Sequence, residues 1–501
     1  MLAPINKIPP EILTLIPDFW NARDRDQDVI ALTHVCRAWR EVFVSRSCLW
    51  TDFDCLDEEK TQVYFKRSGS SPISLSLYRD GPTLPHDPLF GIIPLVTGRL
   101  VSLLIKGALE NLQDITSHLY RPAPLLEELT IRSNGEAAPR HDQVLSPALF
   151  SGDLSSLRKL YLQGVRTKLP WRNMVNLTSF VMGRVSPDDI SVNQLLDFFE
   201  SAPHLCDIDL HSATPYPDAQ YGRLVTLARL ERIEIIDCGP SHCFLDHLSI
   251  PVGAILTTRG DIINSLVGNL LPRSLDNLRN FSNFTTIQLS IVGPNPRMEF
   301  SGPNGRVNVI FSNPGFDGTR LALESLAQLD TSSTEYLIIE EGKPRSSGSP
   351  LYQALLPMTD LRTIELSGCR SPHIFAQVLQ PSMNSSEVVI CPKLEELILE
   401  SPDGVFDIKS VTKMAATRAS RGKKLRMVRL VDRQGELDPK VILELKKHVS
   451  HVEHASELAR LMVNSDTEDR REGDLGNVSL VSWFAFVSRH GVYAQSSTLD
   501  H

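Results

Sequence analysis

The sequence lacks the features that mark several large classes of protein. Its 501 residues include only eight cysteines, at positions 36, 48, 55, 206, 238, 243, 369 and 391, and these are scattered rather than grouped as in a disulfide framework. No apolar run is long enough to span a bilayer, and the start of the chain lacks the basic and apolar segments of a secretory signal. We therefore expect a protein of a reducing compartment, cytoplasmic or nuclear or both, with no membrane partner.

An excess of basic residues is also missing. The chain has 51 Lys and Arg against 60 Asp and Glu, a net charge of −9, and such a charge repels nucleic acid on average. The sequence contains no Gly-x-Ser-x-Gly elbow, phosphate-binding Gly-Lys-Ser/Thr loop, Rossmann fingerprint or His-Glu-x-x-His motif. We therefore expect no nucleic-acid partner, no cofactor and no enzymatic activity. A hydrolase stays open only if a covered pocket brings an acid and a base group together.

What the sequence does contain begins with residues 8–50. Two prolines, Pro9 and Pro10, precede apolar residues as in the first turn of a helix, so we expect a short helix over residues 8–16. From Asp26 onward, apolar side chains recur at helical spacing, which predicts a second helix with one large apolar face. The residues on that face are Val29, Leu32, Cys36, Trp39, Val42 and Phe43.

These segments resemble an F-box. The family pattern is a Leu-Pro-Pro-Glu-Ile-Leu opening, then Val-Cys-Arg-x-Trp-Arg and a closing Leu-Trp, and all three pieces occur here in order. The chain departs from it at Ile8, which replaces the opening Leu, at Pro17, where a Phe is common, and at Ser47, which often is Pro. The resemblance implies a small helical domain over residues 1–52 that binds a Skp-type adaptor and, through it, a cullin.

By the same resemblance, nine residues contact the adaptor or hold the helices that do. They are Pro9, Pro10, Glu11, Ile12, Leu13, Ile16, Val35, Trp39 and Trp50. The alternative is that these residues only cover the end of the domain that follows. Residues 53–70 are expected to form a connecting helix, because 57–68 begins acidic and ends basic, which suits the helix dipole. Residues 71–77 then alternate apolar with polar, as in a strand.

A phrase of the form Leu-x-x-Leu-x-Leu recurs in two runs, from Leu100 to Leu230 and from Leu361 to Leu425, at intervals of 20 to 33 residues within each run. Leucine-rich repeats recur every ~20–29 residues. For residues 71–462 we therefore expect an α/β fold, an irregular leucine-rich-repeat solenoid with a curved parallel sheet and helices on its convex side. The phrase begins at Leu100, Leu126, Leu157, Leu177, Leu205, Leu230, Leu361, Leu394 and Leu425.

The repeats fade between residues 235 and 336, so the number of repeats there stays open. Residues 284–289 keep the phrase, whereas turn sequences at 293–296 and 302–305 separate short alternating runs. Residues 288–311 are therefore either an antiparallel insertion or widened strands within the array. Among the return segments, 186–189 is typical of a helix start, because Ser186 can cap the helix and Pro187 suits its first turn.

The C-terminal part divides into three. A helix over residues 438–448 would cap the last repeat. Residues 463–480 are polar and charged and are expected to be a disordered acidic linker. Residues 481–501 form a tail, of which the apolar 481–487 would dock back on the domain.

Two clusters of polar residues raise further possibilities. Residues 238–247 hold two cysteines and two histidines, but these crowd one segment instead of forming two separated pairs, so we expect no metal site. The most basic stretch is interpreted either as a solvated loop or as a docking patch for an acidic partner. It contains Arg418, Arg421, Lys423, Lys424, Arg426 and Arg429.

The whole pattern resembles the F-box proteins with leucine-rich repeats that are numerous in fungi. The resemblance implies a substrate-recognition subunit of a Skp–cullin–F-box-type ubiquitin ligase, whose repeats bind a target protein that the sequence does not identify. The alternative is a protein-interaction scaffold that works independently of any ligase.

Overall fold

The computed structural model describes most of the chain between residues 8 and 456. The residues it does not describe are 1–7, 14–24, 56, 80–88, 135–143, 146–148, 168–172, 186–189, 214, 220–221, 240, 262–269, 273–276, 279–283, 292–294, 313–317, 341–347, 369–371, 382–388, 402–406, 433–438 and 457–501. The expected linker at 463–480, the tail at 481–501 and residue Ile16 therefore lie outside the described residues.

The N-terminal segment forms short helices that pack against one another. They are α1 (Pro10–Leu13), α2 (Arg25–Thr33), α3 (Arg37–Ser45) and the 3-10 turn Ser47–Trp50. The single helix predicted from Asp26 to Phe43 is wrong, because the chain breaks between α2 and α3, where Cys36 is extended (φ −160°, ψ 173°). Arg40 stabilises the break by donating a hydrogen bond from Nε to the Thr33 carbonyl (2.9 Å), one of the carbonyls exposed at the end of α2.

The sheet begins earlier than the sequence suggested. Strand β1 (Asp52–Asp54) pairs in parallel with β2 (Ile73–Arg79), and α4 (Glu58–Arg67) makes the crossover between them. Asp57 caps α4 by accepting a hydrogen bond from the Lys60 backbone N–H (2.8 Å). The helix expected in the segment 53–70 is therefore present, but a strand precedes it, and α4 is part of the array.

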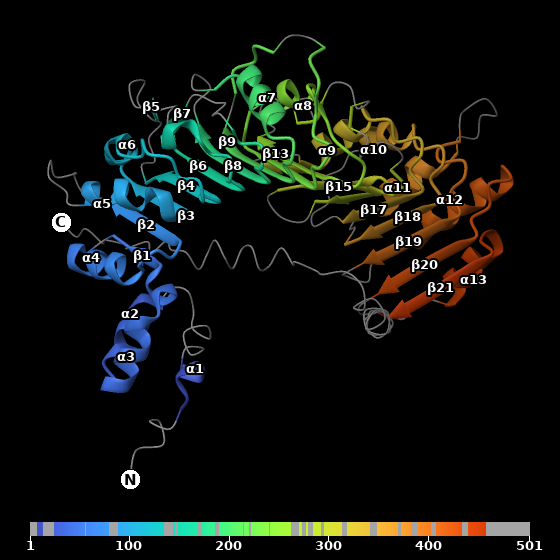
Figure 1. Ribbon diagram of the computed structural model, residues 1–501. Coiled ribbons are helices and arrows are strands. Elements are labelled where there is room, and N and C mark those ends of the chain that lie inside the picture. The colour runs from blue at the N-terminus through green and yellow to red at the C-terminus, as the bar shows by residue number, and fades with distance from the viewer. Residues whose placement is uncertain are drawn as a thin grey trace, which may run out of the picture.

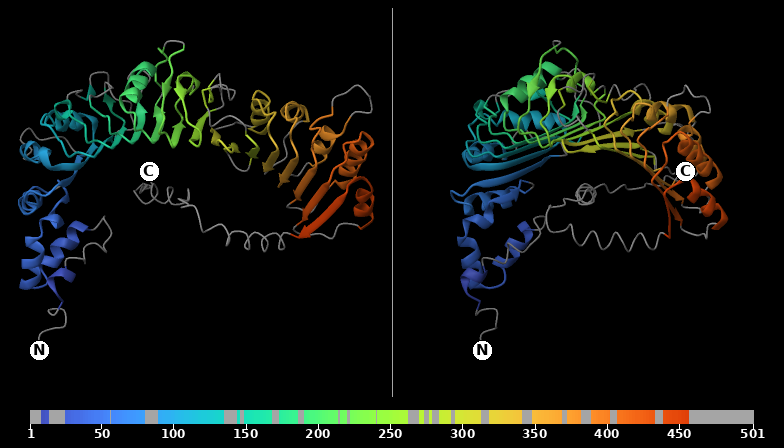
Figure 2. Two further views of the ribbon diagram at one scale, coloured as in Figure 1. Left: turned by 45° about the vertical axis from the view of Figure 1, so that its right-hand side comes forward. Right: turned by 90° about the vertical axis from the view of Figure 1, so that its right-hand side faces the viewer.

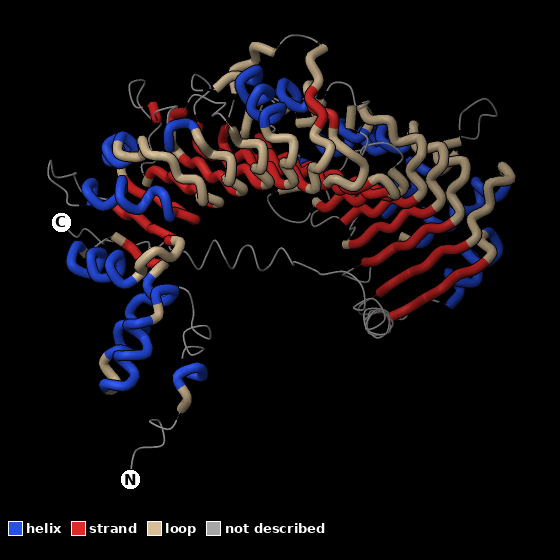
Figure 3. Tube along the Cα trace, in the orientation of Figure 1, coloured by secondary structure: helices blue, strands red, loops and turns tan. Residues whose placement is uncertain are grey.

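The described residues form a mixed α/β structure around one sheet of 17 strands. Nearly all pairs are parallel, and the sheet bends into an arch (Figures 1 and 2). Strands line its inner side, and helices and loops cover the outer side (Figure 3). After β2 the strands of the sheet, in chain order, are β3 (Leu100–Gly107), β4 (Glu128–Ser133), β6 (Lys159–Gln163), β8 (Ser179–Val185), β9 (Asp207–Ala213), β11 (Arg232–Ile236), β13 (Ile255–Asp261), β14 (Thr286–Ser290), β15 (Arg297–Gly302), β16 (Gly305–Ser312), β17 (Tyr336–Glu340), β18 (Thr363–Ser367), β19 (Glu396–Ser401), β20 (Met427–Asp432) and β21 (His451–Ser456).

Helices and short strand pairs make up the rest of the described structure. The pairs are β5 (Val144–Leu145) with β7 (Arg166–Thr167) and β10 (Val225–Thr226) with β12 (Leu248–Ser249), and 3-10 turns occur at Thr97–Arg99 and Leu149–Gly152. The helices after α4 are α5 (Leu89–Val96), α6 (Leu109–Ser117), α7 (Val192–Ser201), α8 (His242–Leu245), α9 (Gly318–Leu326), α10 (Gly348–Leu355), α11 (Pro372–Leu379), α12 (Ile408–Ser420) and α13 (Pro439–His448). Among the described helices, none combines the length and the apolar character needed to cross a membrane.

The leucines that open the repeated phrase explain why the strands form where they do. All nine are buried, and eight of them lie two residues before a strand while Leu100 begins one. Within each strand, alternate side chains point outward into the core under the helices, as Leu160 and Leu162 of β6 do. The buried side chains form one continuous core from Leu13 to Val449, so each unit depends on its neighbours for burial.

Residues 288–311 form an antiparallel insertion. β14, β15 and β16 pair antiparallel in sequence, and this meander joins the parallel parts because β16 pairs with β13 and β14 pairs with β17. The spatial order is therefore β13, β16, β15, β14, β17. The alternative of widened parallel strands is wrong, since β15 runs against both neighbours.

Two of the expected helix ends differ from the structure. Helix α7 begins at Val192, with Ser191 as its N-cap in a reciprocal capping box with Gln194, whereas residues 186–189 lie outside the described residues. The predicted helix near residue 439 is present as α13. It does not cap the array alone, because β21 follows it and extends the sheet beside β20.

Candidate interaction surfaces

The structure separates the residues predicted to bind an adaptor into exposed and buried sets. Ile12 and Val35 are 52% and 48% exposed, and Pro9 is also exposed. Leu13, Trp39 and Trp50 are buried. Pro10 and Glu11 lie in α1, but their side chains are outside the described part of the structure, as is the whole of Ile16.

The buried tryptophans hold the helices together. Trp50 donates a hydrogen bond from its indole N–H to the Phe43 carbonyl of α3 (2.9 Å), and its ring meets Tyr64 of α4 edge-on at 4.9 Å between centroids. Arg67 lies over the same indole at 4.3 Å, a cation–π contact. Trp50 therefore joins the N-terminal helices to the first crossover of the sheet and is not itself available to a partner.

Val35 occupies the turn between α2 and α3. The backbone N–H groups of His34 and Val35 donate to the carbonyls of Ala31 and Leu32 (2.9 and 3.3 Å), which fixes the turn. The branched side chain is thus presented to solvent on a fixed backbone. Ile12 is presented in the same way by α1, whose neighbouring Leu13 enters the core.

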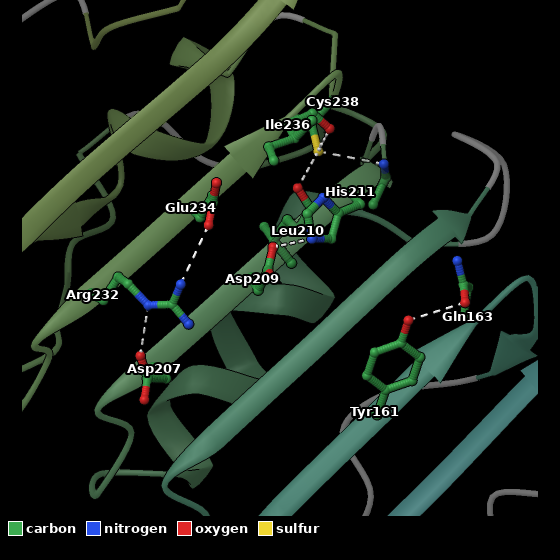
Figure 4. A network of polar contacts seen from close by, with 11 residues as sticks. Tyr161, Gln163, Asp207, Asp209, Leu210, His211, Arg232, Glu234, Ile236 and Cys238 are labelled. Carbon is green, nitrogen blue, oxygen red and sulfur yellow. Dashed lines mark hydrogen bonds and ion pairs between the residues drawn. The ribbon is translucent and has the colours of Figure 1, made fainter. Parts of the chain in front are cut away.

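The inner face of the sheet is the second candidate surface. In the part of the chain that the structure describes, the helices lie on the outer side of the arch and leave this face uncovered (Figures 1 and 2). Its side chains form rows because the parallel register aligns equivalent positions: Asp207 pairs with Arg232, and Asp209 pairs with Glu234. Figure 4 shows that these four side chains, with His211 and Tyr161, gather on neighbouring strands.

The contacts within this patch are mainly between charges. Arg232 lies 3.0 Å from Asp207 (Nε to Oδ1) and 3.4 Å from Glu234 (Nη1 to Oε2). His211 Nε2 lies 2.5 Å from Asp209 Oδ1. Burial disfavours the charged imidazole, but the bond to Asp209 and the nearby acidic charges outweigh it, so the pKa of His211 is raised. Burial, followed by the charge of Asp209, raises the pKa of Glu234.

Cys238 lies beside this patch but is chemically inert. Its thiol is buried and contacts the carbonyl oxygens of Leu210 and Ile236, both at 3.2 Å, and accepts from the Ala213 N–H at 3.4 Å. Burial raises its pKa to about 12, so the thiolate does not form near neutral pH. Cys238 is therefore not a nucleophile that the neighbouring Asp209–His211 pair could activate.

Two of the four Cys and His residues in the segment 238–247 are engaged by other groups, and the side chain of His242 lies outside the described part of the structure. Cys238 is engaged as above, and His247 Nδ1 contacts the Arg223 carbonyl (2.8 Å). Within the described part of the chain, no group of three or more His, Cys, Asp or Glu side chains is arranged to hold a metal ion.

The C-terminal half of the inner face is acidic. Tyr336 donates a hydrogen bond to Glu365 (2.6 Å), Ser367 donates to Glu400 (2.8 Å), and Gln288 donates to Glu340 (3.0 Å). These neutral donors orient the carboxylates without cancelling their charge. The three carboxylates lie on the adjacent strands β17, β18 and β19, so this part of the face has a negative potential.

The basic stretch is neither one solvated loop nor one patch. Arg418 belongs to α12 and is fully buried, so its prediction as a loop residue is wrong. Arg426 contacts Glu396, and Arg429 contacts Glu453 (2.7 Å). Lys423 and Lys424 are exposed. The sequence interpretation considered the charge of Arg418 and not its position in a helix, where it lies on the same face of α12 as the buried Met414.

The residues of the inner-face patch were not predicted as a site. Their signal is present in the repeated phrase, since the x between its last two leucines, such as Tyr161 or Asp209, points away from the core.

A comparison of the sequence with protein-family models gives no match, and a comparison with curated proteins gives none either.

Proposed function

We propose that this protein is an F-box-like substrate receptor of a Skp–cullin–F-box-type ubiquitin ligase. Its N-terminal helices bind a Skp-type adaptor, and the arch, an irregular leucine-rich-repeat solenoid, binds a target protein on its inner face. The observation that carries the proposal is the exposure of Ile12 and Val35. Both residues belong to the F-box-like motif, and both are aliphatic side chains about half exposed to solvent.

Burial of these two side chains would favour association. Full burial of an aliphatic side chain contributes ~1.5–3 kcal/mol, so covering the exposed halves of Ile12 and Val35 contributes roughly 1 kcal/mol each. Leu13, Trp39 and Trp50 support the proposal differently, since they fix the helices that carry the exposed residues.

The receptor would act without covalent chemistry. The N-terminal helices share one core with the sheet, so an adaptor bound at α1 and α2 would have a fixed position relative to a target on the inner face. Such a tether raises the effective concentration of the target near the enzyme that carries ubiquitin. The acidic strands β17, β18 and β19 favour a target segment of complementary charge.

Adaptor capture by the full chain tests the proposal. Ile12→Asp and Val35→Asp place a charge where an apolar contact is expected, and each should weaken binding of a purified Skp-type adaptor at least tenfold. Leu443→Asp is the matched control, because Leu443 is 63% exposed on α13, far along the arch. Absence of binding by the wild-type chain to an adaptor that binds another F-box, or equal loss in the Leu443 variant, would refute the proposal.

The ligase-independent scaffold is the second possibility. It is favoured by the Trp50–Tyr64–Phe53 cluster, in which the N-terminal helices cover the first units of the sheet. Deletion of the first 52 residues cannot separate the two functions, because it uncovers this cluster in either case. The Ile12→Asp and Val35→Asp variants do separate them. A receptor would lose adaptor binding in these variants, whereas a scaffold would show no adaptor binding to lose and would keep its unfolding midpoint.

A further inference from the structure

A polar cavity lies at the edge of the sheet where the strands begin. Its volume is about 490 Å³, and its lining comes from the residues just before five successive strands, β4 to β11. Two arginines, Arg158 and Arg229, are among them, together with Asn176, Thr178, His204 and Glu127. Neither the adaptor surface nor the inner-face patch includes any of these residues.

The two arginines differ from Arg223 and Arg232 of the same region. Arg223 and Arg232 are held by carboxylates at 2.6 and 3.0 Å. Arg158 and Arg229, by contrast, make no side-chain hydrogen bond or ion pair with any of the described residues. A guanidinium presents five N–H donors in a fixed plane that matches the oxygens of a phosphate or carboxylate, so two such groups around one cavity form a site for an oxyanion.

The arginines belong to the β6 and β11 sides of the cavity. Arg158 directly precedes β6, whereas Arg229 lies three residues before β11, where Glu231 holds the position aligned with Arg158. Backbone bonds link Thr178 to Arg158 and Cys206 to Thr178 in successive strands (2.8 Å each). With ~4.8 Å between strands, the starts of β6 and β11 are roughly 14 Å apart. Both arginines line the same cavity as the residues before β8 and β9, so a group bound over β8 and β9 would have one arginine on either side.

The middle of the cavity supplies further polar groups. His204 has a buried Nδ1 with no hydrogen-bond partner among the described residues. Asn176 donates one amide hydrogen to the Ser155 carbonyl (2.7 Å) and keeps a second. A buried ring nitrogen without a partner costs free energy, and a bound oxygen or hydroxyl group would satisfy it.

We propose that this cavity binds a compact oxyanion of the phosphate monoester type, with Arg158 and Arg229 closing on it from either side. Glu127 lines the same cavity on the neighbouring strand β4, and its carboxylate disfavours an anion at that end, so the favoured position is over β8 and β9. The proposal does not depend on adaptor binding.

Calorimetric titration of the full chain with inorganic phosphate tests the site. Saturable binding at millimolar concentration is expected, and Arg158→Gln or Arg229→Gln should each weaken it about tenfold, the value of one charge-assisted hydrogen bond. Arg362→Gln is the matched control, because Arg362 precedes β18 as Arg158 precedes β6 but lies 3.5 Å from Glu395. Absence of phosphate binding, or equal loss in all three variants, would overturn the proposal.

A second set of titrations identifies the source of the oxyanion. A short phosphoserine peptide that binds more tightly than inorganic phosphate, with its serine counterpart inert, supports the site as a reader of phosphorylated chains. Equal affinity of the phosphopeptide and inorganic phosphate supports a site for the free group. Failure of both to bind, or binding by the unphosphorylated peptide alone, contradicts an oxyanion site.

Discussion

Arg418 gives the sharpest test of how the C-terminal half is held together. Its side chain is fully buried in α12 and donates to the carbonyls of Ile390 (2.9 Å) and Cys391 (2.8 Å), with a longer contact to Leu379 (3.4 Å). Burial lowers its pKa. The guanidinium thus ties the end of α11 to the segment that leads into β19.

Replacement by methionine keeps most of the volume and removes the donors. The carbonyls of Ile390 and Cys391 would be left without these bonds in buried surroundings, at a cost of ~1–3 kcal/mol each. Part of this is offset because a buried guanidinium carries a desolvation penalty of its own. We expect Arg418→Met to destabilise the protein by about 2–5 kcal/mol.

Urea unfolding followed by circular dichroism measures the effect, and hydrogen exchange locates it. Exchange should quicken in α11, α12 and β19, because Arg418 joins these elements and proteins open locally before they unfold completely. Lys423→Met is the control, since it removes the same charge from an exposed position. If Arg418→Met unfolds at the same urea concentration as Lys423→Met, the buried hydrogen bonds do not stabilise the array and the reasoning is wrong.

Two further predictions concern single side chains. Asp209→Asn should lower the pKa of His211, which NMR of histidine-labelled protein measures. Because the folded pKa of His211 is raised, the stability lost in the variant should be greatest below the unfolded value of ~6.5 and should vanish as pH rises through the folded pKa. An unchanged histidine titration would contradict the Asp209 contact. Among the described cysteines, exposed Cys48 should react with a thiol reagent in the native protein, whereas Cys238 and Cys391, whose pKa values burial raises to about 12, should react only on unfolding; native-state labelling of Cys238, read by mass spectrometry, would contradict its burial.

The sequence predicted the strands that are preceded or begun by the buried leucine of the repeated phrase. It missed β17 and β21, because Thr334 and Val449 occupy the equivalent buried positions two residues before those strands. A search for leucine alone cannot find them, since the position requires burial and not one residue type. The meander was visible only as turn sequences, and its pairing with β13 and β17 is a long-range property that no local pattern encodes.

The interaction surfaces were predictable to different degrees. Motif resemblance singled out Ile12 and Val35 but could not separate them from Leu13, Trp39 and Trp50, because exposure depends on how α1, α3 and α4 pack. Arg418 was misassigned since its charge was weighed above its helical phase. The inner-face patch depends on register between strands as distant as β6 and β11, which the irregular repeat lengths conceal.

The order β13, β16, β15, β14, β17 has a consequence for how the chain can fold. A parallel array grows by adding the next strand of the sequence to the last one. This order is interrupted at β13, whose next neighbour in the sheet is β16, while β15 and β14 lie beyond β16. The connections β13 to β14 and β16 to β17 each pass over two strands, so the pairs β13–β16 and β14–β17 join strands that are not consecutive in the sequence. Because non-local pairing carries a larger loop-closure cost, we expect these two pairs to form more slowly than the pairs between consecutive parallel strands.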